Sequence, residues 1–431
     1  MKSGLPHSYF DRAQVKSVTS GHRLADGLDT KIAEVSTSLQ SSVRPIVEDL
    51  IGTSHRPVTL ARRLGIDKTL TGRIMRSVRA NDPFEILHNA PAPHGLRIFL
   101  KAAADAGVDE DLREKAESSI ADFESLIDAF PEGRSALEAA ISDYIPEVRK
   151  RNERTAKQSV YKSMSYLLGY QAEASLLTTV ISPSERSDMV DTTHVDSMIG
   201  LRRLRGESPV NLFGIRRHCM LPDATNWIET LGGDRGIDDA HQFLLENYCG
   251  KPIPSLRVHD SANVRYSVLD AESLPINEPV TLVNGWTIRN ASLRYADDEH
   301  THEWHSSLLR IPTRTRVQDY FVHQDVWPGP PDFVPGMPGL DISTVRTPQS
   351  GPQHDRIDMD MPVEHLGLGV HQPGIRHSTA PWYQEMLGHV FESRKLNPNE
   401  YRAYRCEIVY PVPFVRMMVW FNLAQKPHEQ A

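Results

Sequence analysis

The spacing of apolar residues changes along this chain of 431 residues, from a helical period in its N-terminal part to a strand period near its C-terminus. Two N-terminal stripes recur at steps of three and four, which place each of them on one face of an α-helix. They comprise Ile32, Val35, Leu39, Val43, Ile46 and Leu50, and then Leu112, Ala116, Ile120, Phe123 and Ile127. A further helix is predicted over 146–181. We expect the first helix to kink or break at Pro45, because proline removes a hydrogen bond from the helix.

Strand patterns begin after about residue 251 and favour an antiparallel, β-rich region. The predicted strands cover 280–283, 286–295, 317–327, 404–410 and 414–423. Asn284 and Gly285 separate the first two strands. An Asn-Gly pair accepts the positive φ angles of a tight turn, so a β-hairpin is predicted there. The Pro-, Gly- and His-rich stretch 328–381 is expected to form long loops.

The composition is that of a soluble globular protein, with 39% hydrophobic and 24% charged residues. No apolar run approaches the roughly 18 residues that a membrane-spanning helix needs. Residues 1–10 lack the apolar stretch of a signal peptide. Cys219, Cys249 and Cys406 match neither a metal-ligand spacing nor a disulfide framework. We therefore expect a cytoplasmic protein with reduced thiols.

Positive charge is concentrated in one short segment of an acidic chain. The formal net charge is −8, whereas residues 44–80 contain eight basic and three acidic residues, a local charge of +5. The basic residues are Arg44, Arg56, Arg62, Arg63, Lys68, Arg73, Arg76 and Arg79. A basic module on an acidic body is typical of a protein that contacts nucleic-acid phosphates through one element.

Within that segment the sequence predicts two short helices joined by a tight turn. Pro57 favours the start of a helix, where its missing N–H would have no partner. Gly65 favours a helix end with a sharp turn, and Asp67 can cap the next helix. The residues predicted to face the rest of the domain are Leu60, Ala61 and Leu64, then Leu70, Ile74 and Val78.

The opposite face of the second helix is polar and cationic. It carries Thr69, Gly72, Arg73 and Arg76, with Lys68 at its edge. A helix that enters the major groove of DNA needs this combination, because arginines and short polar side chains reach base edges and cations neutralise phosphates. The same helix–glycine–helix pattern is also typical of structural helical pairs and of protein-binding surfaces.

The string VTLARRLGIDKTLTGRIM, residues 58–75, resembles the helix-turn-helix of bacterial transcription regulators such as the lac repressor group. The matching positions are the small Ala61 where the two helices cross, Gly65 and Ile66 in the turn, and the inward-facing Ile74. The resemblance covers about 22 residues, and no family is indicated for the rest of the chain. It implies a recognition helix over about 67–79 and double-stranded DNA as the partner.

Two positions depart from the family pattern. Thr71 stands where the family usually has a buried aliphatic residue, and Gly72 lies inside the second helix, at a cost of about 1 kcal/mol relative to alanine. The predicted DNA contacts are Thr69, Gly72 and Arg73 at the major groove, and Arg62, Arg63, Lys68 and Arg76 at phosphates.

These patterns together predict an α+β protein. An all-α N-terminal half with a helix-turn-helix is followed by a β-rich mixed C-terminal half with antiparallel hairpins. The predicted regions are a flexible tail at 1–28, a helix-turn-helix domain at 29–95, a helical linker or oligomerisation region at 96–200, and an α+β domain of unknown role at 201–431.

The predicted function is that of a DNA-binding transcriptional regulator with a C-terminal sensing or assembly domain. A homodimer is expected, because one recognition helix contacts only a few base pairs. The helical stretches within 109–181 are the candidates for the dimer contact. We expect a binding protein rather than an enzyme, with no cofactor.

Two alternatives stay open for the function. The first is an enzyme or metal-binding protein with a His-rich site in the C-terminal half, and the second is a structural or assembly protein whose helical pair binds other proteins. The sequence contains no phosphate-binding glycine loop and no nucleophile elbow. The candidate metal ligands are His300, His302 and His305, but acidic neighbours at 297–299 favour a solvated loop, so no metal is expected.

Overall fold

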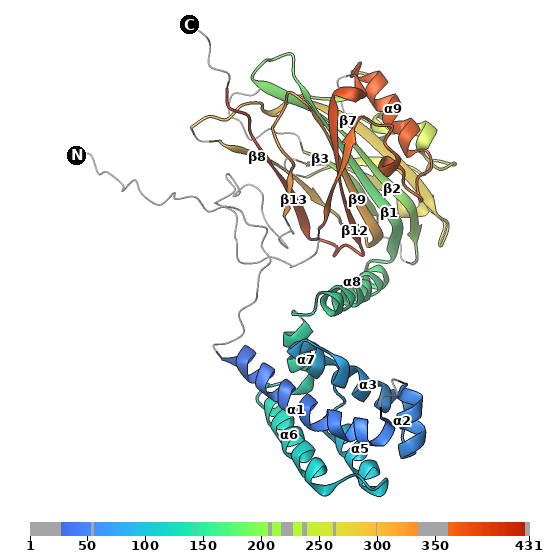
Figure 1. The fold of residues 1–431 in the computed structure, drawn as a ribbon. Helices are drawn as coiled ribbons and strands as arrows, with labels where there is room; N and C mark the ends of the chain where they lie inside the picture. The colour runs from blue at the N-terminus through green and yellow to red at the C-terminus, as the bar shows by residue number, and fades with distance from the viewer. Residues whose placement is uncertain are drawn as a thin grey trace, which may run out of the picture. The chain divides into compact units, whose positions relative to one another are not determined.

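A computed structural model describes residues 27–52, 56–142, 144–205, 209–216, 227–234, 239–261, 264–298, 300–334 and 361–426. The chain forms two compact units, residues 1–152 and residues 153–431 (Figure 1). Helices build the first unit and strands dominate the second, so the fold class is α+β as predicted. Residues 1–26 of the predicted tail lie outside the described residues.

The boundaries between the units differ from the predicted ones. The predicted boundary after residue 95 falls inside helix α5 (Pro93–Asp105), and the one after residue 200 falls inside strand β2 (Met189–Arg203). The structure divides the chain within helix α8 (Pro146–Leu168) instead. The helix-turn-helix segment is therefore part of a larger helical unit and not a separate domain ending at residue 95.

Unit 1 is a helical bundle in which α1 (Leu28–Ile51) supplies one long apolar face. The other helices are α2 (Pro57–Leu64), α3 (Lys68–Arg79), α4 (Pro83–Asn89), α5, α6 (Glu110–Asp128) and α7 (Arg134–Ser142). Helix α1 continues through Pro45, so of the predicted kink or break, the break is wrong. Ile46 and Val47 directly after the proline are buried, and this packing compensates for the missing hydrogen bond.

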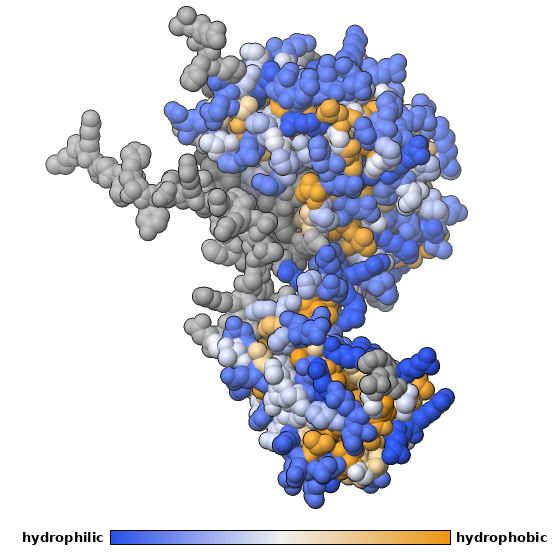
Figure 2. Space-filling model, viewed as in Figure 1, coloured by the Kyte–Doolittle hydropathy of each residue, from blue (hydrophilic) through white to orange (hydrophobic). Residues whose placement is uncertain are grey.

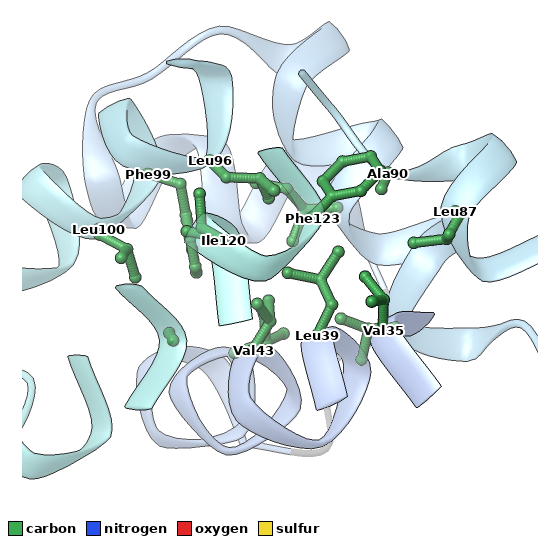
Figure 3. Close-up of a cluster of buried hydrophobic side chains, with 14 of the residues drawn as sticks. Val35, Leu39, Val43, Leu87, Ala90, Leu96, Phe99, Leu100, Ile120 and Phe123 are labelled. Carbon is green, nitrogen blue, oxygen red and sulfur yellow. The ribbon is translucent and has the colours of Figure 1, made fainter. Parts of the chain in front are cut away.

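The core of unit 1 lies where α1 meets α5 and α6. Leu39 and Val43 of α1 point toward Phe99 of α5 and Phe123 of α6 (Figure 3). These side chains are almost completely buried. Burial of each such side chain contributes about 1.5–3 kcal/mol, so the periodic stripes recognised in the sequence form the main stabilising interior of this unit.

Unit 2 is built on a seven-stranded sheet. Its order is β11 (Val363–Leu368), β12 (Tyr401–Val409), β9 (Thr313–His323), β1 (Tyr170–Pro183), β2, β7 (Val280–Leu293) and β4 (Trp227–Thr230). Strands β1 and β9 run parallel, and the other neighbours in the sheet are antiparallel. The predicted strands at 317–327 and 404–410 correspond to β9 and β12.

Two three-stranded sheets complete the strands of unit 2 among the described residues. One has the order β10 (Asp332–Val334), β13 (Arg416–Asn422), β8 (His302–Leu308), and the other β3 (Val210–Arg216), β6 (Val264–Leu269), β5 (Leu256–Ser261). The predicted strand at 414–423 corresponds to β13. The stretch 328–381, predicted as loops, contains β10 and β11 in its described part, while residues 335–360 lie outside the described residues.

Different layers cover the two faces of the large sheet. Helix α9 (Tyr383–Ser393) packs its buried residues, among them Met386 and Val390, against one face (Figure 1). On the other face, Val419 and Phe421 of β13 pack against Tyr320 of β9. The large sheet is therefore the middle of three layers, and its central strands are covered on both sides.

Two local predictions for unit 2 are wrong for the same physical reason. The helix predicted over 146–181 ends at Leu168, where Gly169 has a positive φ of 78°, and strand β1 follows. Asn284-Gly285 lies inside the continuous strand β7 and forms no hairpin. Both strands have neighbours on either side in the sheet and are largely buried on both faces, so they lack the alternation that reveals a strand in a sequence. At Gly285 a Cβ atom would lie 3.0 Å from a methyl carbon of Leu231, which explains the glycine by packing.

None of the helices in the described part of the chain combines the length and apolarity required to cross a bilayer.

The buried position of Phe123 predicts a large loss of stability on truncation. Phe123→Ala leaves a cavity beside α1 and should lower the free energy of unfolding of unit 1 by about 3–5 kcal/mol, measured by urea denaturation. Lys101→Ala, on an exposed position of α5, is the control and should change it by less than about 0.5 kcal/mol. Equal effects of the two changes would contradict this account of the core.

Candidate nucleic-acid interface

Helices α2 and α3 begin and end at the residues that the sequence indicated. Arg56 precedes Pro57 in extended conformation, and α2 ends at Gly65, whose φ of 67° is left-handed. Asp67 is the N-cap of α3, and its carboxylate accepts hydrogen bonds from the backbone N–H groups of Thr69 at 2.7 Å and Leu70 at 3.1 Å. Two residues, Ile66 and Asp67, thus separate the turn glycine from the first residue of α3.

The backbone N–H groups of Leu70 and Thr69 hold the pKa of Asp67 below its ordinary value, because they stabilise the charged carboxylate. The start of α3 consequently depends on the ionised form of an exposed side chain. The carboxylate also offsets part of the positive charge at this end of the helix pair.

Helix α3 is buried over most of its circumference. Ile74 and Val78 are buried as predicted, and Leu70 is partly buried. Met75 and Ser77 are buried as well, and the Ser77 hydroxyl donates to the carbonyl of Ile86 at 2.8 Å. The exposed part of α3 is therefore a narrow stripe formed by Lys68, Thr69, Arg76 and Arg79.

Thr71 departs from the family pattern at a position that the structure buries completely. Its hydroxyl lies 3.2 Å from the carbonyl oxygen of Pro57 and 3.1 Å from that of Lys68. A buried hydroxyl is tolerated when it has a hydrogen-bond acceptor, and here the acceptor on α2 connects the two helices. The departure is thus compatible with a close helix pair.

Gly72 was predicted to face DNA, and the structure corrects this because the residue is buried. A Cβ atom added there would meet the Nη1 atom of Arg76 at 3.8 Å. The Arg76 side chain therefore lies over Gly72. A guanidinium, and not the glycine backbone, is presented to a partner at this position.

Arg73 was predicted to read bases, but its guanidinium is occupied within unit 1. It donates to the carbonyl of Ala90 at 2.9 Å and to that of Asn89 at 3.4 Å, and lies 3.9 Å from the Glu138 carboxylate. Burial and the neighbouring Arg134 lower its pKa. Arg73 thus fixes α3 to the end of α4 and to α7. The sequence could not show this, because its partners lie 16 or more positions away.

Five cationic side chains remain exposed on the helix pair: Arg62, Arg63, Lys68, Arg76 and Arg79. Over the described ranges of the chain, none of the five forms an ion pair. Strongly hydrophilic residues gather in Figure 2 along the side of unit 1 where Figure 1 labels α2 and α3. Arg79 belongs to this cluster although the predicted contacts omitted it. Arg79 could have been predicted from the sequence, because it follows Arg76 by three residues and this spacing places both side chains on one helix face. We call these five residues the cationic surface.

The candidate metal ligands of unit 2 do not come together. His300 contacts Asp297, with its Nδ1 atom 3.0 Å from the carboxylate, and His302 Nδ1 contacts the Thr301 hydroxyl at 2.7 Å. His305 lies on β8 among aromatic rings. The solvated loop predicted here is wrong from His302 onward, because β8 pairs with β13. The described residues contain no group of three or more His, Cys, Asp or Glu side chains that could hold a metal ion.

Comparisons with known proteins leave the family open. No family model matches the chain, and no curated protein matches it. Among solved structures it is similar to a native yeast LTA4 hydrolase (10% identity, TM-score 0.22) and to a protein of Parabacteroides distasonis described as a protease (9% identity, TM-score 0.24). Each alignment covers 59% of this chain, but only 29% and 40% of the respective relatives. Similarity at this level carries no functional argument.

The cap of α3 predicts a pH-dependent stability. Because folding lowers the pKa of Asp67, its contribution is present above the unfolded pKa and is lost as the pH falls through the folded pKa. Asp67→Ala should therefore lower the urea midpoint of unit 1 near about pH 7 and have little effect near about pH 2. Asp122→Ala, an exposed position within α6, is the control. A difference between wild type and Asp67→Ala that is the same at both pH values would contradict the proposed cap.

Proposed function

We propose that this chain binds double-stranded DNA through the cationic surface of α2 and α3 and acts as a transcriptional regulator. The observation that carries the proposal is the exposure of five cationic side chains on two short helices joined at Gly65. The buried side of α3 holds the helix in the bundle, and the exposed stripe is left for a partner. A polyanion suits this surface better than an apolar partner does.

Binding would depend on electrostatics despite the net charge of −8. Each cation that neutralises a phosphate releases counterions, and the logarithm of the affinity then falls with the logarithm of the salt concentration, with a slope of about 0.9 per contact. The acidic remainder of the chain would oppose nonspecific adhesion elsewhere on its surface. The cationic surface would therefore determine which face meets DNA.

The proposal divides the roles differently from the expectation based on the sequence. Lys68, Thr69 and Arg76 on the exposed stripe of α3 are the candidates for base contacts, because Arg73 is occupied and Gly72 is covered. Arg62, Arg63 and Arg79 at the sides of the stripe are the candidates for phosphate contacts. An arginine that reaches guanine bidentately discriminates against other bases by about 1–3 kcal/mol.

A homodimer is part of the proposal. The exposed stripe of α3 is short, so one copy would contact only a few base pairs. Two copies related by a two-fold axis would contact half-sites separated by one helical turn of DNA, about 34 Å. The prediction that helices within 109–181 form the dimer contact stays a prediction, limited to α6, α7 and α8, because residues 170–181 form β1.

The main alternative is a helical pair that binds another protein. Such surfaces usually have aromatic or aliphatic anchors. In the described part of unit 1 the exposed large hydrophobic residue is Ile98, which lies on α5 and not on α2 or α3. Among the described residues, neither α2 nor α3 carries an exposed large hydrophobic side chain, and this favours DNA over an apolar protein partner.

Charge removal on the cationic surface tests the proposal. Arg63→Ala should weaken binding to all DNA sequences and reduce the magnitude of the salt slope by about 0.9. Arg76→Ala should in addition reduce discrimination between sequences selected from a random pool, by about 1–3 kcal/mol. Fluorescence anisotropy with labelled duplexes at several salt concentrations measures both effects on the full-length protein.

The matched control is Lys115→Ala, which removes an exposed charge from α6, outside the cationic surface. Its binding should follow that of the wild type. If wild-type protein binds no duplex at low salt, or if Lys115→Ala weakens binding as much as Arg63→Ala does, the cationic surface is not the DNA-binding site.

Arg73 should act through the stability of unit 1 and not through base contacts. Arg73→Ala removes the hydrogen bonds to the carbonyls of Asn89 and Ala90, at a cost of about 1 kcal/mol. Urea denaturation should show this loss, while sequence preference stays unchanged in the folded fraction. An altered preference without lost stability would return Arg73 to the base-reading role.

A further inference from the structure

A cluster of polar side chains lies between the seven-stranded sheet and strands β8 and β13 of unit 2. The residues opposite one another in the strand register share this face of the sheet, as Asn284 opposite Asp196 and Ser175 opposite Arg316 do. Contacts to Ser307 and Met417 close the cluster from the second sheet. We call it the inter-sheet polar cluster. Its members are Ser175, Thr179, His194, Asp196, Asn284, His305, Ser307, Arg316, Gln318 and Tyr320.

The two deepest members of this cluster have polar atoms without hydrogen-bond partners. Asn284 and Gln318 are fully buried, with 0% of their surface exposed. Neither the amide nitrogen nor the amide oxygen of Asn284 has a partner, and the Oε1 atom of Gln318 has none. Buried polar groups are almost always paired in native proteins, because each unpaired group costs about 1–3 kcal/mol. Asn284 lies on β7 and Gln318 on β9, with β2 and β1 between them, so unsatisfied polar atoms extend across this face of the sheet and call for a binding role.

The charged members are only loosely paired. Arg316, with 3% exposure, donates from Nη1 to the Ser175 hydroxyl, and the same atom lies 3.5 Å from the Asp196 carboxylate. The Nε atom of Arg316 and the Oδ1 atom of Asp196 have no hydrogen-bond partner. One guanidinium and one carboxylate offset each other, so the cluster offers donors and acceptors without a net charge.

The two histidines are neutral at physiological pH. Burial lowers the pKa of His194 to about 3 and that of His305 to about 4. Thr179, Arg316 and Tyr320 face them from neighbouring strands, and Glu303 lies two residues from His305 on the same side of β8. Burial raises the pKa of Glu303 to about 7. His305 Nε2 has no hydrogen-bond partner, so a neutral imidazole is a further group available to a ligand.

Aromatic rings border the same cluster. The ring centroid of Trp286 lies 5.3 Å from that of His194, and the rings of Trp327 and Phe421 lie 5.9 and 5.8 Å from that of His305. His194 and His305 are themselves only half-buried, so the cluster reaches solvent on their side. Unpaired polar atoms with buried aromatic rings beside them are an arrangement suited to a flat ring with polar edges.

The opposite face of the same sheet provides an internal comparison. There Arg405 donates to both oxygens of Asp319, at 2.8 and 2.6 Å, and the Tyr383 hydroxyl donates to Asp319 at 2.6 Å. That buried network has its hydrogen bonds made within the protein. The sheet can therefore satisfy buried charges, and the unsatisfied groups are confined to one face.

We propose that the inter-sheet polar cluster is a binding site for a small, uncharged, planar molecule of the nucleobase class. The Asn284 amide supplies a paired donor and acceptor of the type that recognises base edges, and the Oε1 atom of Gln318 supplies a further acceptor, since its Nε2 atom already donates to Ser307. The absence of net charge excludes a phosphate or carboxylate as the main recognised group. The site lies wholly in unit 2, so it stands independently of the proposed DNA binding by unit 1.

Thermal unfolding of the full-length protein with adenine, cytosine and uracil as probes tests the site. At least one probe should raise the melting temperature of the wild type in a concentration-dependent manner, because it binds the folded state only. Calorimetric titration should give one site per chain. Asn284→Leu should weaken binding at least tenfold, and without a probe it should melt at a higher temperature than the wild type, because an unsatisfied amide has been removed.

The matched control is Thr287→Val on the same strand. Thr287 is equally buried, but its hydroxyl is paired with Thr193 on the other face of the sheet at 2.8 Å. This variant should melt slightly lower than the wild type and keep its response to the probe. If Asn284→Leu does not fold, Gln318→Leu tests the loss of binding in its place, although it also removes the hydrogen bond to Ser307. The titration of the wild-type protein with the probes tests binding whichever of the two variants is used.

Two results would overturn the proposal. One is the absence of a concentration-dependent shift with all three probes. The other is a response that Asn284→Leu and Gln318→Leu retain, since binding would then lie elsewhere. Because no DNA enters the experiment, a failure here leaves the DNA-binding proposal intact, and the anisotropy experiment can fail without affecting this site.

Discussion

The left-handed backbone at Gly65 sets the direction in which α3 leaves α2, and the candidate interface depends on that direction. A residue with a Cβ atom would be strained at a φ of 67°, so the turn between α2 and α3 requires a glycine. Thr71 then connects α3 to the start of α2, and Arg73 connects it to the end of α4. These contacts leave one stripe of α3 exposed, and it is cationic. The turn at Gly65 thus creates the cationic surface and also limits it to few residues.

The predictions for unit 1 agree with its structure where the spacing of apolar residues decides the fold. They differ from it where contacts between residues far apart in the sequence decide. The stripe from Ile32 to Leu50 correctly indicated α1, and Pro57, Gly65 and Asp67 marked the ends of α2 and α3. Arg73 shows the limit of this reasoning. Its position on a helical wheel is polar and outward, but carbonyl acceptors from α4 come within hydrogen-bond distance only in the folded unit.

The strands of unit 2 were harder to predict from the sequence, because its central strands are covered on both faces. Strand β1 shows apolar residues without alternation, which resembles a continuing helix, and Asn284-Gly285 imitates a turn inside β7. The polar interior was hidden for the same reason. Ser175, Asp196 and Arg316 lie more than 20 residues apart from one another, and only the strand register places them together. No local pattern in a sequence reports such a juxtaposition.

The cationic surface of unit 1 and the inter-sheet polar cluster of unit 2 lower the stability of the protein for different reasons. Exposed cations on α2 and α3 remain solvated, so their mutual repulsion is small and is screened by salt. The unpaired amide of Asn284 and the unpaired amide oxygen of Gln318 are buried, and nothing screens that penalty. The seven-stranded sheet is large enough to tolerate it, since α9 and β13 cover both of its faces with apolar side chains. A penalty of this kind is relieved by a ligand that supplies the missing hydrogen bonds, so the stability of unit 2 itself would report occupancy of the inter-sheet polar cluster.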